Sequence, residues 1–207
     1  MGGRDHLDDA PAPGALRRRD AVIAGHLGDE ATAREAKSND DPAIRASAYG
    51  ALARMGALDD SELRDALRDP APTVRMRAAA LTTERPEVSP APLLADPSDD
   101  VAETAAWACG EDAAADLDTM ACLAELATGH PNPLVREAAV AALGAIGHPA
   151  GLDAILVATT DRAAVRRRAV LALAPFEGPE VEAALRRASA DRDWQTRDAA
   201  ELLMDPD

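Results

Sequence analysis

Apolar residues recur along this chain at the spacing of amphipathic helices, and one arrangement of them repeats. In the stretch 132–144, a capping Asn132 and a first-turn Pro133 precede an Ala/Leu face that Gly144 ends. Six copies aligned on one aliphatic position lie 30, 27, 34, 30 and 31 residues apart, at Ile44, Val74, Val101, Val135, Val165 and, more weakly, Thr196. Self-similarity at such a period predicts stacked supersecondary units.

Each unit is predicted to fold into two helices. The first helices are expected near 29–38, 60–68, 90–95, 117–129, 151–159 and 179–189. The second helices are expected near 42–55, 72–84, 99–110, 133–146, 163–174 and 193–204. A further helix over 15–27 is expected to cover the first face of the array, and Trp194 the open end of its core. Four prolines around 90–95 predict an irregular stack there.

The repeated pattern D-P-x-x-x-V-R-x-x-A-A-x-A-L-G resembles the HEAT repeat, in the short bacterial form named after phycobilisome lyases. The resemblance covers roughly 15–204. It implies an all-α protein, a right-handed α-solenoid of about six HEAT-like helical hairpins. We therefore expect one solenoid domain over 15–207, preceded by a disordered polar lead over 1–14.

In HEAT repeats an aspartate and an arginine form a buried ladder between neighbouring turns, and this sequence has candidates for both. An arginine follows the aliphatic residue in five units, at Arg45, Arg75, Arg136, Arg166 and Arg197, whereas the third unit has Ala102. The partner positions, six residues earlier, hold Asn39, Asp69, Asp96, His130, Thr160 and Asp191. The resemblance thus implies the pairs Asp69–Arg75 and Asp191–Arg197, a weaker Asn39–Arg45 contact, and a break in the third unit.

Composition favours thin helical layers and excludes several partners. Aromatic residues make up 2% of the 207 residues, too few large side chains for one thick core. The net charge of −15 argues against nucleic acid or an anionic membrane as a partner. Neither a bilayer-spanning run nor a secretory signal is present in the sequence. We therefore expect a cytoplasmic protein, and we expect it to be monomeric. An Ala/Arg/Asp-rich chain with a single lysine is typical of GC-rich bacteria, so we also expect a bacterial source.

Charge and helix register together predict a partner-binding groove. Residues two and six positions after the aliphatic residue are predicted to point outward from each second helix, toward the concave face. The stretch 86–135 carries ten acidic residues and no Lys or Arg, whereas 162–197 carries eight arginines. The candidate partner-binding residues are Met76, Glu103, Trp107, Glu137, Arg167 and Leu171. We infer a basic protein partner, the alternatives being that the acids serve only solubility and that Trp107 packs against the next repeat.

The sequence lacks the motifs of catalysis and of cofactor binding. It has no H-E-x-x-H, nucleophile elbow, P-loop or dinucleotide fingerprint. HEAT proteins that hydroxylate deoxyhypusine use His-Glu dipeptides for iron, and none of the four histidines here precedes a glutamate. Cys109 and Cys122 lack C-x-x-C spacing and are expected to be buried, reduced thiols rather than a redox or metal pair. We therefore expect no catalytic residue, no metal, no cofactor and no enzymatic activity.

Two other functions of HEAT-like proteins stay open as alternatives to a non-catalytic scaffold or adaptor. Phycobilin lyases bind a tetrapyrrole with apolar and acidic groove residues, a role that Glu103, Trp107 and Glu137 could fill; a host that makes phycobilins would favour it. DNA glycosylases of this type need a basic groove and aromatic contacts to a damaged base. An acidic chain with four aromatic residues fits that function poorly.

Overall fold

The computed structural model describes residues 16–112 and 115–204, and the predicted disordered lead over 1–14 lies outside these ranges. Every regular element of the described residues is helical, which confirms the predicted all-α class. The chain forms two compact units, Met1–Leu58 and Asp59–Asp207. The single solenoid domain over 15–207 therefore stays a prediction.

The first unit contains three helices, α1 (Arg18–Leu27), α2 (Glu30–Ala36) and α3 (Pro42–Arg54). Both α1 and α2 pack against α3, and α1 also contacts α2. Their shared core is small, with Ala21, Ala36, Ile44 and Ala48 buried and Leu16 packed against them. The predicted hairpin 29–55 is thus present, and the helix expected over 15–27 lies against its second helix.

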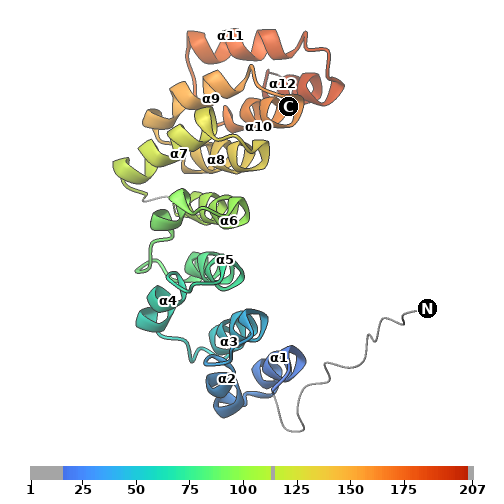
Figure 1. Ribbon diagram of the computed structural model, residues 1–207. Helices are drawn as coiled ribbons and strands as arrows, with labels where there is room; N and C mark the ends of the chain where they lie inside the picture. Colours follow the sequence, from blue (N-terminus) through green and yellow to red (C-terminus); the bar gives the residue numbers. More distant parts are fainter. Residues whose placement is uncertain (1–15, 113–114, 205–207) are drawn as a thin grey trace, which may run out of the picture. The chain divides into compact units, whose positions relative to one another are not determined.

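The second unit is a stack of helical hairpins (Figure 1). Its first helices are α4 (Asp60–Ala66), the 3-10 helix η2 (Ala91–Ala95), α7 (Leu117–Gly129), α9 (Leu152–Ala158) and α11 (Pro179–Ala188). Its second helices are α5 (Pro72–Leu81), α6 (Asp99–Gly110), α8 (Pro133–Ile146), α10 (Ala163–Ala172) and α12 (Trp194–Met204). The short 3-10 turn η1 (Thr82–Glu84) follows α5, and the 3-10 turn η3 (Pro149–Gly151) precedes α9.

The predicted start signals act as helix caps. The carboxylate of Asp59 accepts a hydrogen bond from the Glu62 amide, and Glu62 reaches back to the Asp59 amide, so the pair forms a capping box. Asn132 caps α8 by accepting from the Leu134 amide at 2.9 Å, and Pro133 occupies the first turn. The helix expected over 90–95 is instead a 3-10 helix over Ala91–Ala95, which ends at an extended Asp96 because the following Pro97 disfavours the helical conformation there.

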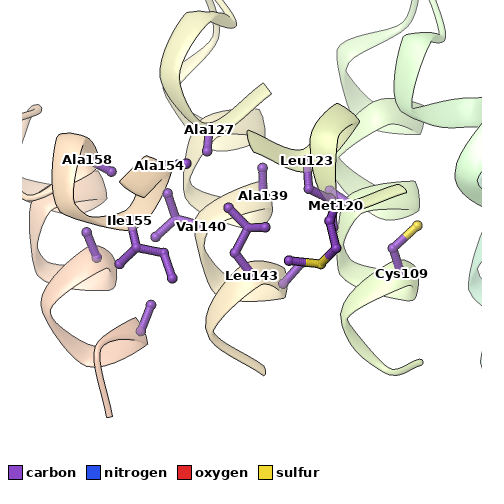
Figure 2. Close-up of a cluster of buried hydrophobic side chains, with 14 of the residues drawn as sticks. Cys109, Met120, Leu123, Ala127, Ala139, Val140, Leu143, Ala154, Ile155 and Ala158 are labelled. Atoms are coloured by element: carbon purple, nitrogen blue, oxygen red, sulfur yellow. The ribbon is translucent and has the colours of Figure 1, made fainter. Parts of the chain in front are cut away.

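The core of the second unit lies between the two rows of helices (Figure 2). Leu123 of α7, Leu143 of α8 and Ile155 of α9 are all fully buried. Alanines of both rows fill the space between these larger side chains, so each layer is thin. Trp194 differs from its prediction: it is 63% exposed, while the buried stripe of α12 begins two residues later at Thr196.

Successive second helices approach each other closely at glycine. A Cβ added to Gly144 of α8 would lie 2.7 Å from the Ala172 Cα of α10, and one added to Gly110 of α6 would lie 2.8 Å from the Ala142 Cα of α8. Both distances are shorter than a carbon–carbon contact allows. The glycines therefore set how closely α6, α8 and α10 pack. Gly129, at the end of α7, faces open space.

We expect Gly144→Ala to lower stability by about 1–3 kcal/mol, because the added methyl group must push α8 and α10 apart. The control Gly129→Ala should raise stability by about 0.4–1 kcal/mol, since alanine restricts the unfolded chain at a site with free space. Thermal unfolding followed by circular dichroism compares the two variants. Equal midpoints for both would contradict the close packing.

The two cysteines differ in environment. Cys109 is buried, as predicted, whereas Cys122 is exposed, which corrects its expected burial. The buried stripe of α7 runs through Met120, Leu123 and Ala127, and Cys122 lies off that stripe. Burial, with smaller contributions from Asp112, Cys122 and Asp116, raises the pKa of the Cys109 thiol to about 12.

Because the thiolate is the reactive form, the folded protein should present one reactive thiol at pH 8. We expect Ellman's reagent to release one equivalent of chromophore rapidly, and a second only after denaturation. Cys122→Ser should abolish the rapid phase, and Cys109→Ser should leave it unchanged. Rapid reaction of both thiols in the folded protein would contradict the burial of Cys109.

Candidate functional site

A groove of about 640 Å³ lies over three successive second helices, α6, α8 and α10. From α6 and its C-terminal cap it is lined by Glu103, Thr104, Trp107, Gly110 and Glu111. From α8 and α10 it is lined by Leu134, Glu137, Ala138, Ala141, Ala142, Ala145 and Arg168. Its volume lies within the range of about 300–1,000 Å³ that is usual for ligand sites.

The helix register explains which positions line the groove. Counted from the aliphatic residue of each unit, the lining positions include those two, three, six and ten residues later. At about 100° per residue these positions fall within one sector of roughly 100° on the helix surface. The sector includes the predicted positions two and six, and it also includes position three, which brings in Arg168.

The two sides of the groove differ in the size of their side chains. Trp107 on α6 is 47% exposed, and therefore is not sealed between helices. Opposite it, α8 presents a row of alanines, such as Ala138, Ala141 and Ala145, that leave the space open. An exposed indole above a floor of methyl groups provides apolar contact area for a ligand.

The groove carries three carboxylates and one guanidinium. Glu103 makes no ion pair among the residues that the structure describes, and burial, together with the negative charges of Asp100 and Glu137, raises its pKa. Arg168 Nε lies 3.6 Å from Glu137 Oε1, and their side chains are 46% and 23% exposed. The raised pKa of Glu103 indicates a site that would gain from an added positive charge.

The structure brings together three of the six residues that the sequence predicted for partner binding. Glu103, Trp107 and Glu137 line the groove, whereas Met76, Arg167 and Leu171 do not. Arg167 donates a hydrogen bond to the Gln195 side chain, and Leu171 packs against the core that α10 shares with α12. Both therefore face the next hairpin. Arg168 could have been identified from the sequence, because the position three residues after the aliphatic residue lies in the same helical sector as positions two and six.

Arginine–aspartate pairs link successive hairpins of the second unit. Arg75 donates from Nε and Nη2 to Asp96 of the next hairpin, at 2.6 and 2.8 Å. Arg136 bonds Asp161 in the same way, at 2.6 and 2.9 Å. For Arg166 and Asp191 the Nη2–Oδ1 hydrogen bond is 2.9 Å, and the Nε–Oδ2 contact of 2.7 Å is not aligned as a hydrogen bond.

These contacts correct the predicted pairing within one unit. Arg75 donates from Nη1 to the backbone carbonyl of Asp69, not to its carboxylate, and Arg197 does the same with Asp191. In the first unit, Arg45 likewise donates to the Asn39 carbonyl. Each of these arginines thus donates to a backbone carbonyl in the loop of its own hairpin. The ion pair between hairpins is formed with the aspartate in the loop of the following hairpin.

One further position differs from the predicted ladder, and one falls at the predicted break. The fifth unit uses Asp161, one residue after the expected Thr160. Arg166 donates to the Asp161 carbonyl five residues earlier, whereas the other ladder arginines donate to a carbonyl six residues earlier, so this loop segment is one residue shorter. At the junction of the third and fourth units, where Ala102 replaces the arginine, Asn132 donates from Nδ2 to Asp99 at 2.8 Å. His130 Nε2 lies 3.8 Å from the same carboxylate.

The ladder should make stability depend on pH. The hydrogen bond from Arg136 lowers the pKa of Asp161 below its ordinary 3.8, so its stabilising effect is present above that value and is lost as pH falls through the lowered pKa. Asp161→Asn should reduce the free energy of unfolding by about 1–3 kcal/mol at pH 7. The difference from wild type should shrink at acidic pH.

Urea titrations at neutral pH and near pH 2 measure this effect, with Asp65→Asn as the control. Asp65 is an exposed residue of α4, so its substitution should change the unfolding midpoint little at either pH. A loss for Asp161→Asn that is equally large in acid would show that the carboxylate charge is not what stabilises the junction.

No cluster of three or more His, Cys, Asp or Glu side chains within 16–112 and 115–204 has an arrangement that could hold a metal ion. Over the same ranges, the helices are too short or too polar to cross a bilayer.

Comparisons with known proteins identify the repeat. Residues 91–163 match the family model for HEAT repeats, which confirms the resemblance for the third unit, the fourth unit and the first helix of the fifth. None of the curated proteins has a matching sequence.

A designed armadillo repeat protein in complex with the peptide (KR)4 has a TM-score of 0.61 at 16% identity, covering 84% of this chain and 97% of that protein. Human deoxyhypusine hydroxylase in complex with glycerol has a TM-score of 0.49 at 19% identity, covering 90% of this chain and 77% of that enzyme. The armadillo likeness shows the fold alone, and with the hairpin stack it confirms a solenoid of helical repeats.

Proposed function

We propose that this protein is a cytoplasmic, non-catalytic scaffold that binds a basic segment of a partner protein in the groove over α6, α8 and α10. The observation that carries the proposal is the lining of that groove. An exposed tryptophan stands among three carboxylates and a single guanidinium, above a floor of alanines. Such a surface is complementary to an extended peptide with basic side chains.

The two kinds of lining residue would have separate tasks. Trp107 would supply contact area, because a large aromatic side chain at the centre of an interface contributes most of the affinity. Glu103 and Glu137 would attract the partner at long range and exclude acidic competitors. Since exposed ion pairs contribute only about 0–1 kcal/mol each, removing one glutamate should matter less than removing the indole.

The fold supports an interaction role. HEAT- and armadillo-like repeats form extended scaffolds with long surfaces on which a partner can lie. The designed armadillo repeat protein that shares this fold was solved with a peptide of alternating lysine and arginine. That protein therefore provides an example of a helical-repeat scaffold holding a basic peptide, and its peptide is a practical probe for the groove.

The proposal predicts that a fluorescein-labelled (KR)4 peptide binds the full chain, with an affinity that falls as salt is raised. Trp107→Ala should weaken binding about thirtyfold, as expected for an aromatic anchor that the bound peptide covers. Glu103→Gln and Glu137→Gln should each weaken it about two- to fivefold and reduce its salt dependence. Fluorescence anisotropy over a range of salt concentrations measures all three variants.

The matched control is Trp194→Ala, which removes the second tryptophan of the chain from an exposed site outside the groove. It should leave peptide affinity unchanged, and circular dichroism should show both alanine variants folded. Binding that does not depend on Trp107, or that strengthens with salt, would contradict the proposal. Stoichiometric uptake of a linear tetrapyrrole in place of the peptide would instead favour the chromophore-handling alternative.

A further inference from the structure

Arg168 is the single cation among the residues that line the groove. Its closest contact with Glu137, from Nε to Oε1, is 3.6 Å, and no hydrogen bond joins these two side chains of the described structure. The ladder arginines differ, since Arg136 forms two hydrogen bonds to Asp161 of 2.6 and 2.9 Å and others to loop carbonyls. Within the described residues, Arg168 makes no polar contact besides the one to Glu137. Its guanidinium is therefore held weakly.

The exposed fractions of the arginine side chains also indicate that Arg168 is held weakly. The side chain of Arg168 is 46% exposed, whereas those of the ladder residues Arg136 and Arg166 are 12% and 11% exposed. A half-exposed ion pair without a hydrogen bond contributes little to stability. Arg168 can thus leave Glu137 at a small cost in free energy. The Glu137 carboxylate would then remain in the groove, at a place where it can pair with another guanidinium.

We infer that the groove binds an arginine side chain of the partner peptide, and that this arginine takes the place beside Glu137 that Arg168 holds in the free protein. The inference rests on the proposed function and names the residue that the groove recognises. Arg168 then acts as an internal competitor, which lowers the affinity for every peptide that needs Glu137. Its release leaves the carboxylates of Glu103 and Glu137 facing the ligand together.

The lining favours arginine over lysine. A guanidinium is planar and weakly hydrated, so it can lie against the Trp107 indole and the methyl groups of α8 without losing as much hydration as an ammonium would. It can also donate to a carboxylate while its flat face contacts an aromatic ring. An ammonium group has no such face, although its charge is the same.

The test uses two labelled peptides, one of four arginine–alanine repeats and one of four lysine–alanine repeats, and two charge-neutralising variants. Arg168→Gln removes the internal competitor. Arg167→Gln is the control, because it makes the same change of charge one residue earlier on α10, at a side chain that faces Gln195 and not the groove. Both variants alter the long-range field alike, so a difference between them reports the groove contact.

We expect Arg168→Gln to tighten arginine-peptide binding about threefold relative to Arg167→Gln, the size of one exposed ion pair. The arginine peptide should also bind wild type several times more tightly than the lysine peptide. Suppose that binding depends on Trp107. If Arg168→Gln then binds the arginine peptide no more tightly than Arg167→Gln does, or if the lysine peptide binds wild type as tightly as the arginine peptide, the inference is wrong and the proposed function stands. If neither peptide binds any of these proteins, both are wrong.

Discussion

The close approach of the second helices is the constraint on which the rest of the second unit depends. At Gly110 and Gly144 the neighbouring helix lies so near that a single methyl group would overlap its backbone. Helices at this separation favour small side chains, and the core of this unit consists mainly of alanine, valine and leucine. The 2% aromatic content of the chain agrees with this packing.

The same constraint explains why a tryptophan is exposed. The space between α6 and α8 is too narrow for an indole, so Trp107 lies on the outer surface of α6. The alanines of α8 that permit close packing are also short enough to leave a hollow beside it. One choice of small residues thus produces both the dense interior and the open groove, and the large side chain at its edge is available to a ligand.

Most of the helical architecture could be predicted because each hairpin repeats a local pattern of caps and apolar spacing. The starts of α3, α8 and α11 follow directly from first-turn prolines. Contacts between hairpins were less predictable, since they depend on loop length and on rotation about the helix axis. A loop shorter by one residue moved the ladder partner to Asp161, and a rotation of one position brought Arg168 into the groove. Trp194 and Cys122 were misplaced because an apolar side chain near a helix end, or beside the buried stripe, need not be covered.

The altered junction between the third and fourth units has a consequence for the order of the repeats. There the arginine and the aspartate of the ladder are both absent, replaced by Ala102 and His130, and an asparagine–aspartate contact links the hairpins instead. Moving either unit elsewhere in the array would leave a half-buried arginine or aspartate without its counter-ion, which costs more than the intact pair contributes. The ladder therefore constrains the order of the repeats at this one junction: the third unit has to be followed by the fourth, because either of them beside a different neighbour would leave a ladder charge unpaired.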